Sequence, residues 1–300
     1  MKVLISGASG LIGQFLCRTL KESGNEVISL VRDKNLESTD TIFWDPAHGK
    51  LQNEKLEGID AAVNLSGENI AGKRWSEDRK KSILQSRIQS SKILVDALIG
   101  LDQPPKVLIC SSAIGYYGNR SDEICTEETK SGKGFLAEVC RQWEATAHPA
   151  GANGIRTVLL RTGIVLSPDG GALAKMLPLF KLGLGGALGS GEQYMSWIAI
   201  DDLVGAIVFA LSNENMKGPV NGTAPNPVKN AEFTSVLGKV LGRPTVLSVP
   251  AFALKLLLGK EMAEELLLCS TRALPEKLLQ HGYTFKYPSL EEGLKKILQK

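Results

Sequence analysis

The sequence has few cysteines, few histidines and no long hydrophobic run. Its five cysteines are odd in number and include no Cys-x-x-Cys pair, so neither a disulfide framework nor a zinc site is expected. The 35 basic and 32 acidic residues leave a net charge of only +3, which gives no electrostatic case for nucleic acid as a partner. No window approaches the roughly 18 consecutive apolar residues of a membrane span, and no membrane partner is expected.

The remaining composition is that of a globular protein with a substantial core. Of the 300 residues, 43% are hydrophobic and 22% are charged, as in ordinary soluble domains. A strand pattern begins at residue 2, so no signal or transit peptide is expected. With the cysteine pattern, this predicts a cytoplasmic protein. The chain has three isolated histidines, His48, His148 and His281. They have neither the spacing of metal ligands nor the partners of a Ser-His-Asp set.

Short apolar runs alternate with amphipathic stretches over the first part of the chain. The pattern predicts strands at 2–6, 26–31, 41–44, 61–66, 106–111 and 156–161, separated by helices at 11–23, 77–98 and 134–148. Near-continuous apolar strands that alternate with helices are typical of a parallel sheet covered on both faces. We therefore expect an α/β fold with a Rossmann-type doubly wound parallel sheet.

The pattern changes after about residue 170. A glycine-rich stretch at 183–191 interrupts the periodicity, and the last hundred residues carry short helices and strands separated by prolines. We expect residues 1–170 to form the nucleotide-binding domain, with some later elements returning to it. Residues 171–300 would form a smaller α+β lobe on the substrate side.

Three glycines, Gly7, Gly10 and Gly13, lie between the first strand and the first helix. In this context glycines permit a tight turn and let the backbone approach a pyrophosphate, which rests on the helix N-terminus. The spacing is GxxGxxG, and an ordinary turn is the alternative explanation. The position directly after a strand and before a helix favours a dinucleotide site.

The second strand ends at Val31, Arg32 and Asp33, nineteen residues beyond Gly13. An NAD site places a carboxylate here for the ribose hydroxyls, whereas an arginine accommodates the 2′-phosphate of NADP. The alternative is a solvated Arg32, with Asp33 holding the ribose. The position of Arg32 at the strand end favours NADP(H).

Two further strand ends are expected at the cofactor, because ligands of open α/β sheets bind at the carboxyl ends of strands. One carries Asn64, Leu65, Ser66 and Gly67, and the other carries Ser111, Ser112 and Ala113. Small residues there would let the nicotinamide half lie close to the backbone. Simple helix–strand packing explains each of them equally well.

Several further motifs give the chain a specific resemblance. They are Asn64 to Ile70, Arg74-Trp75, Ser86-Arg87, Ile114 to Gly118, Trp143-Glu144, Arg161 to Leu166, Trp197 to Leu203, Asn221-Gly222 and Gly282-Tyr283. Together they resemble the extended short-chain dehydrogenase/reductases of the NAD-dependent epimerase/dehydratase superfamily. Within them the match is to the epimerase-like branch 39U, whose own C-terminal module corresponds to about 249–298.

The resemblance implies NADP(H) as cofactor and extends the set of binding residues. Arg87 would reach the phosphates or ribose, and backbone near Val165 would contact the nicotinamide amide. Without the resemblance, Arg87 could equally be a solvated helix residue. The full expected set is Gly7, Ser9, Gly10, Leu11, Ile12, Gly13, Val31, Arg32, Leu65, Ser66, Gly67, Arg87, Ser111 and Val165.

The catalytic pattern departs from that of the active extended enzymes. Those enzymes use a Ser/Thr and a Tyr-x-x-x-Lys pair, in which the tyrosinate takes the hydroxyl proton of the substrate. Aligning the motifs places Ala113, Leu136 and Cys140 at these three positions. The usual catalytic groups are therefore expected to be missing.

The nearest remaining hydroxyls are the catalytic candidates: Tyr117, Tyr116 and Ser112. Alternatively, the two tyrosines only line the pocket. Weaker candidates, with no spacing to single them out, are Lys133, Glu138, Arg161 and Lys175, and the pair at Glu127 and Glu128 is expected to be solvated.

Two functions follow. One is an NADP-dependent oxidoreductase or sugar-nucleotide epimerase that acts, as a monomer or homodimer, on a small molecule between two lobes; sugar nucleotides are the candidates given by the resemblance. The other is a non-catalytic NADP(H) sensor or interaction protein, since fold does not fix function.

Overall fold

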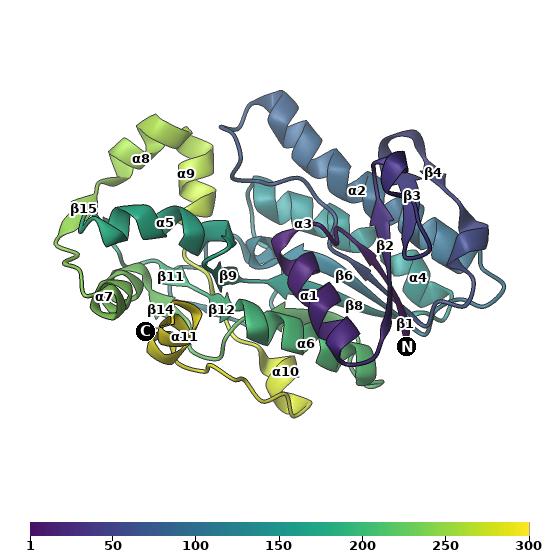
Figure 1. Ribbon diagram of the computed structural model, residues 1–300. Coiled ribbons are helices and arrows are strands. Elements are labelled where there is room, and N and C mark those ends of the chain that lie inside the picture. The colour runs from purple at the N-terminus through teal and green to yellow at the C-terminus, as the bar shows by residue number, and fades with distance from the viewer. Residues whose placement is uncertain (300) are drawn as a thin grey trace.

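In the computed structural model, which describes residues 1–299, the centre is an eight-stranded sheet of order β13-β8-β6-β5-β1-β2-β3-β4 (Figure 1). Neighbouring strands are parallel except at the β3–β4 edge. The strands are β1 (Lys2–Ser6), β2 (Glu26–Val31), β3 (Thr41–Asp45), β4 (Lys50–Leu51), β5 (Ala61–Asn64), β6 (Val107–Ala113), β8 (Arg156–Thr162) and β13 (Gly218–Gly222).

Helices cover both faces of this sheet. On one face, α1 (Leu11–Glu22) and α6 (Ile200–Ser212) pack in one core, and on the other, α2 (Glu77–Ile99) and α4 (His148–Ala152) pack in a second. A further helix, α3 (Phe135–Ala145), lies beside α2. Burial on both faces identifies the doubly wound arrangement.

Strand β1 shows why its sequence is apolar without alternation. Val3 and Ile5 belong to the core with α1 and α6, while Leu4 between them belongs to the core with α2 and α4. Successive side chains of a strand point to opposite faces, so a strand buried on both sides needs apolar residues at every position.

The later part of the chain builds a third core. It is formed mainly by α5 (Gly171–Lys181), α7 (Asn230–Leu241) and α11 (Leu290–Ile297), with Trp197 and Phe233 fully buried among them. The remaining elements are β7 (Ile124–Cys125), β9 (Ile164–Ser167), β10 (Gly186–Leu188), β11 (Tyr194–Met195), β12 (Trp197–Ala199), β14 (Val228–Lys229), β15 (Leu247–Val249), α8 (Ala251–Leu258), α9 (Lys260–Leu266), β16 (Arg272–Ala273) and α10 (Glu276–Gln280).

The expected α/β class and Rossmann-type sheet are confirmed. After residue 170, α6 and β13 pack on and join the main sheet, and the division at 170 stays a prediction. Three elements end two or more residues from the expected position. The strand expected at 61–66 ends at Asn64, and the strand expected at 106–111 continues to Ala113. The helix expected at 134–148 ends at Ala145, and α4 begins at His148, because Pro149 lacks the N–H that a continuous helix needs.

Candidate functional site

The loop after β1 is held tightly against the loop after β5. Gly7 has a φ of +73°, a conformation that favours glycine. A Cβ on it would lie 2.8 Å from the Leu65 carbonyl oxygen, and a Cβ on Gly13 would overlap the Gly7 carbonyl oxygen. Since β1 and β5 lie where the strand order reverses, the loop stands at the topological switch point where open α/β sheets bind ligands.

The N-terminus of α1 is suited to an anion. Gly10 is its N-cap and has no side chain to satisfy the first amides, and the first turn carries no acidic residue. By contrast, α2 begins with Ser76 as a capping side chain and with two acidic residues. Free amides and a positive helix end favour phosphate at α1. Ser9, Leu11 and Ile12 lie at this end in the sequence, and their contact with the cofactor stays a prediction.

At the end of β2, Arg32 and Asp33 have different roles. The side chain of Arg32 is exposed. The Asp33 carboxylate accepts a hydrogen bond of 2.9 Å from the Asn35 backbone N–H, which caps a short 3-10 turn. One oxygen of Asp33 is therefore engaged in its own turn, whereas the exposed Arg32, directly after Val31, has no such local partner among the described residues.

Asn64 organises the end of β5. Its Oδ1 accepts hydrogen bonds from Ser6 Oγ (2.6 Å) and from the Ser66 backbone N–H (3.2 Å), and its Nδ2 donates to Ser91 Oγ (2.8 Å). The same Ser91 hydroxyl accepts from the Trp143 indole (2.9 Å). This buried network fixes the loop that carries Leu65, Ser66 and Gly67, and sequence reasoning did not assign it a role.

Arg87 holds the next part of this loop. Its guanidinium donates to the carbonyl oxygens of Ile83 (2.9 Å) and Glu68 (3.0 Å) and lies 5.0 Å from the centroid of the Trp143 ring. Burial lowers its pKa. A Cβ on Gly67 would lie 3.1 Å from Arg87 Cζ. Arg87 thus contacts the Gly67 loop, and its contact with the cofactor stays a prediction.

Ser111 and Val165 are both half-buried, on β6 and β9. Val165 packs against the same core as Leu11 at the start of α1. It therefore lies on the same side of the sheet as α1. The role expected for each of them at the nicotinamide half stays a prediction.

Tyr117 and Ser112, two of the three catalytic candidates, have buried hydroxyls with protein partners. Tyr117 is 0% exposed, and its hydroxyl donates to Asn221 Oδ1 (2.7 Å) and accepts from Arg161 Nη1 (3.1 Å). Burial raises its pKa, despite the nearby Arg161. Ser112 Oγ donates to Glu144 Oε1 (2.7 Å). Neither hydroxyl is open to a substrate in this structure, which weighs against the catalytic roles expected for them.

Arg161 is the centre of this buried cluster. It is 3% exposed and forms two bonds with the Glu144 carboxylate, at 2.8 and 2.9 Å. Although burial opposes it, the bonds to Glu144 raise the pKa of Arg161. Its Cζ lies 3.5 Å from the centroid of the Tyr116 ring, so a fixed cation covers one face of that ring. Tyr116 is only half-buried.

The three positions that the resemblance aligns with the usual catalytic set lie together. Cys140 Sγ is 3.6 Å from the Ala113 carbonyl oxygen, and a Cβ on Gly115 would lie 3.2 Å from Leu136 Cβ and 3.9 Å from Cys140 Sγ. A methyl group, an isobutyl group and a thiol therefore occupy this region. Burial raises the pKa of the thiol to about 11, so it stays protonated near neutral pH.

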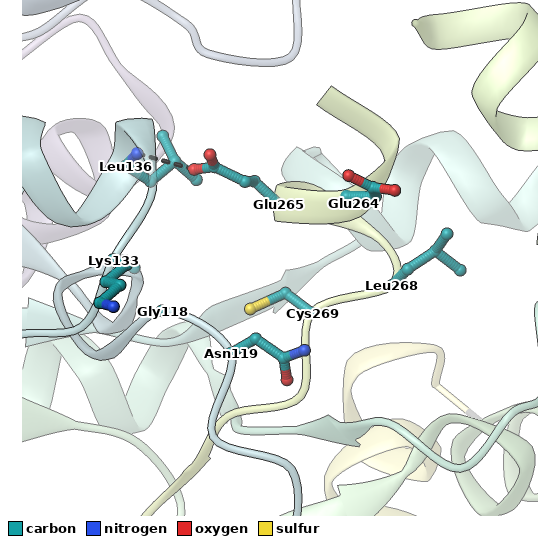
Figure 2. A pocket seen from close by; sticks show the side chains of 9 residues that line it. Gly118, Asn119, Lys133, Leu136, Glu264, Glu265, Leu268 and Cys269 are labelled. Atoms are coloured by element: carbon teal, nitrogen blue, oxygen red, sulfur yellow. Dashed lines mark hydrogen bonds between the residues drawn. The ribbon is translucent and has the colours of Figure 1, made fainter. Parts of the chain in front are cut away.

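A cavity of about 360 Å³ opens beside these positions (Figure 2). It lies between the loop after β6, the start of α3 and the end of α9, so both halves of the chain contribute to it. Its lining residues are Gly115, Gly118, Asn119, Lys133, Leu136, Glu264, Glu265, Leu268 and Cys269.

Glu265 joins the two sides of the cavity. Its carboxylate accepts hydrogen bonds from the backbone N–H groups of Phe135 (2.8 Å) and Leu136 (2.7 Å), as Figure 2 shows for Leu136. A carboxylate from α9 thus caps the first turn of α3. No sequence signal connects residues 130 positions apart, so sequence reasoning missed Glu265.

The expectation that Glu127 is solvated was wrong. It is 4% exposed, and its Oε1 accepts from the backbone N–H groups of Asn221 (3.0 Å) and Lys277 (3.3 Å). Burial raises its pKa, against these amides. The Glu127 side chain therefore connects its own loop to β13 and to the start of α10.

Within residues 1–299, no group of three or more His, Cys, Asp or Glu side chains could hold a metal ion. The candidate site comprises the glycine loop, Arg32 and the ends of β5 and β6. The cavity lies next to the end of β6.

Comparison with known proteins identified matches over nearly the whole chain. Residues 3–221 match the NAD dependent epimerase/dehydratase family, and residues 249–297 match a domain of unknown function (DUF1731). An epimerase family protein of Mycobacterium bovis is 44% identical over 292 residues, which cover 97% of this chain and 96% of that protein.

Two solved structures are also similar. The human epimerase family protein SDR39U1 (isoform 2), crystallised with NADPH, has a TM-score of 0.91 at 35% identity, and the match covers 100% of both chains. A nucleoside-diphosphate sugar epimerase from Corynebacterium glutamicum has a TM-score of 0.81 at 37% identity, covering 99% of this chain and 58% of that chain.

Proposed function

Because the chain belongs to the NAD dependent epimerase/dehydratase family, and to the epimerase-like branch 39U that its motifs indicated, we propose that it binds NADP(H) and acts on a small molecule as an oxidoreductase or epimerase. The observation that carries the proposal is the glycine cradle at the open end of α1, with exposed Arg32 at the neighbouring strand end. The human relative crystallised with NADPH supports it.

The residues present fit this cofactor. Protein packing requires the absence of a side chain at Gly7 and Gly13, whereas a Cβ on Gly10 would meet only the Gly7 carbonyl oxygen, at 3.3 Å. At Gly10 the close approach of a ligand is the additional reason for glycine. The free amides of α1 would hold the pyrophosphate, and the Arg32 guanidinium suits the 2′-phosphate.

The cavity beside Gly115 and Leu136 is the proposed substrate site. When bound, NADP(H) supplies or accepts a hydride. Lys133 and Asn119 offer hydrogen-bond donors to a polar substrate, and Glu265 fixes the wall formed by α3. A volume of about 360 Å³ suits a small polar molecule or the sugar part of a larger one. The sugar-nucleotide epimerase of Corynebacterium glutamicum supports the sugar-nucleotide version of this proposal.

Tyr116 is the proposed proton donor or acceptor. Unlike Tyr117, it is half-buried, and its ring lies against the cation of Arg161, which Glu144 holds in place. The guanidinium is attracted to the face of this ring, which holds the side chain of Tyr116 in a fixed position. Tyr116 therefore combines a half-buried side chain with a fixed electrostatic partner.

Replacement of the two tyrosines separates these roles. Tyr116→Phe is expected to lower kcat about 100-fold or more, the usual loss for an acid–base group, without changing NADPH affinity. Tyr117→Phe is expected to lower the free energy of unfolding by about 1 kcal/mol, since it removes the buried hydrogen bonds of the hydroxyl to Asn221 Oδ1 and from Arg161 Nη1, and to retain most of the activity. Turnover unaffected by Tyr116→Phe would contradict the role of Tyr116.

A non-catalytic NADP(H) sensor is the second candidate. It is favoured by Ala113, Leu136 and Cys140 at the usual catalytic positions and by the buried hydroxyl of Tyr117. The discriminating experiment follows the absorbance of the reduced nicotinamide when the protein, NADPH and a panel of keto-compounds and keto-sugars are mixed. Oxidation of NADPH that depends on Tyr116 supports the enzyme. A partner protein that binds in one redox state of the cofactor, without turnover, supports the sensor.

A cytoplasmic location and a monomeric or homodimeric state stay part of the proposal. Size-exclusion chromatography with light scattering measures the second of these directly.

A further inference from the structure

The smaller lobe carries a cluster of protruding apolar side chains, which we call the lobe face. Its members come from the end of α5 and the loop after it, from β15 with the residue before it, and from α8. Their exposed fractions lie between 50% and 87%. They are Leu179, Leu182, Leu184, Val246, Leu247, Phe252, Leu256 and Leu257.

The three segments of the lobe face are neighbours in space. Strand β10, which follows Leu184, pairs in parallel with β15. The backbone N–H of Gly189 donates to the Val249 carbonyl oxygen at 2.9 Å, and a Cβ on Gly183 would lie 3.6 Å from Pro244. Figure 1 shows β15, α8 and the end of α5 together at one end of the molecule, away from the N-terminal domain.

The segments that carry the lobe face contain no acidic residue. Residues 170–191 and 233–260 contain no aspartate or glutamate. Lys255 pairs with Glu264 from the neighbouring helix at 2.7 Å. Lys181, Arg243 and Lys260 are exposed, and no carboxylate in the described part of the chain lies within ion-pair distance of them. The apolar side chains are therefore bordered by unpaired cations.

We propose that the lobe face is a peripheral contact for an anionic lipid bilayer. Apolar side chains that protrude beside cations match the layered chemistry of such a surface, in which anionic headgroups lie over acyl chains. A second copy of the same face fits less well, because a symmetric contact would bring the cations of both copies together.

This inference concerns contact with a membrane surface and departs from the expectation that the chain has no membrane partner. Within residues 1–299, no helix has the length and apolar character to cross a bilayer. The contact would therefore depend on shallow insertion of Phe252, Leu256 and Leu257 together with attraction of the cations. It is independent of the proposed reaction.

The test is sedimentation of the full chain with vesicles. We expect binding to vesicles of phosphatidylcholine mixed with phosphatidylglycerol, and at least about tenfold weaker binding to phosphatidylcholine alone or at high salt, since the attraction of cations to headgroups is screened. Absence of binding to the anionic vesicles at low salt overturns the proposal.

Variants locate the contact. The double variant Leu256→Ser with Leu257→Ser is expected to weaken vesicle binding at least about tenfold, because two side chains no longer enter the acyl region. Lys181→Glu with Arg243→Glu is expected to weaken it similarly. Leu279→Ser is the matched control, since this exposed leucine lies on α10, and it should bind as the parent does.

All variants should keep the parent's thermal unfolding midpoint and NADPH affinity, because the changed side chains are exposed. Equal vesicle binding by the lobe-face variants and by Leu279→Ser overturns the proposal. So does a concentration-dependent dimer that the leucine substitutions abolish, because the lobe face would then be a contact between two copies.

Discussion

The three glycines of the first loop are glycines for different physical reasons. At Gly7 and Gly13, a side chain would meet backbone atoms of the protein itself, whereas at Gly10 it would meet a single oxygen at 3.3 Å. The sequence motif treats them alike. The structure separates two positions that hold the loop together from one whose main effect is on the ligand.

Alanine substitution is expected to separate them experimentally. Gly13→Ala should lower the free energy of unfolding by about 1–3 kcal/mol, as overpacking does. Gly10→Ala should change stability by less than about 1 kcal/mol but weaken NADPH binding, because its methyl group occupies space at the phosphate site. Urea unfolding and NADPH fluorescence titration measure the two effects. Equal losses of stability would contradict this assignment.

Arg32 is expected to determine the choice of cofactor. Arg32→Ala should weaken NADPH binding about tenfold or more, because the 2′-phosphate loses its bidentate partner. NADH, which has no 2′-phosphate, should bind the variant and the parent equally. Isothermal titration with both nucleotides measures this. Equal loss for the two nucleotides would show that Arg32 acts on something other than the 2′-phosphate.

At the scale of elements, the N-terminus of α3 depends on a residue from another part of the chain. Glu265→Ala removes the carboxylate from the amides of Phe135 and Leu136 and is expected to cost about 1 kcal/mol of stability. Glu264→Ala is the matched control on the same helix, since its pair with Lys255 is exposed to solvent and contributes little to stability. Urea unfolding compares them. An equal effect of both would contradict the capping role of Glu265.

The buried Glu127, which links β13 to α10, makes the free energy of unfolding depend on pH. Burial raises its pKa above the unfolded value, so the folded protein binds this proton more tightly than the unfolded chain does. The stability that the proton contributes is present below the unfolded pKa of about 4 and is lost as pH rises through the folded pKa.

Glu127→Gln removes this titration. The decrease in the free energy of unfolding from pH 4 upward should therefore be smaller in the variant than in the parent, as measured by urea unfolding across that range. Gln can still accept the two backbone hydrogen bonds. A variant with the same pH dependence as the parent would exclude Glu127 as a source of it.

The elements of the nucleotide domain could be predicted because each is encoded locally. Strand β1 and helix α1 have apolar patterns that burial on both faces requires, and the glycine loop lies between them. The contacts of Glu265 with α3 and of Glu144 with Arg161 could not be predicted, because they join elements through space. The burial of Tyr117 was missed for the same reason, since its partner Asn221 lies 104 positions away.

At the scale of the whole molecule, the main sheet and the later part of the chain have separate cores, and residues from both parts of the chain line the cavity. The sheet places the glycine loop and Arg32 at its switch point, and the lobe supplies Glu264, Glu265 and Leu268 to the cavity wall. This division supports an arrangement in which the sheet holds the cofactor, and the sheet and the lobe together hold the substrate.

The central claim is that the chain binds NADP(H) in the glycine loop, with the 2′-phosphate at Arg32. Titration of the unmodified protein with NADPH and, in parallel, with NADH tests it most directly. We expect NADPH to bind at least about tenfold more tightly, from the added charge-assisted hydrogen bonds to one phosphate. Equal affinity for the two nucleotides, or tighter binding of NADH, would contradict the claim.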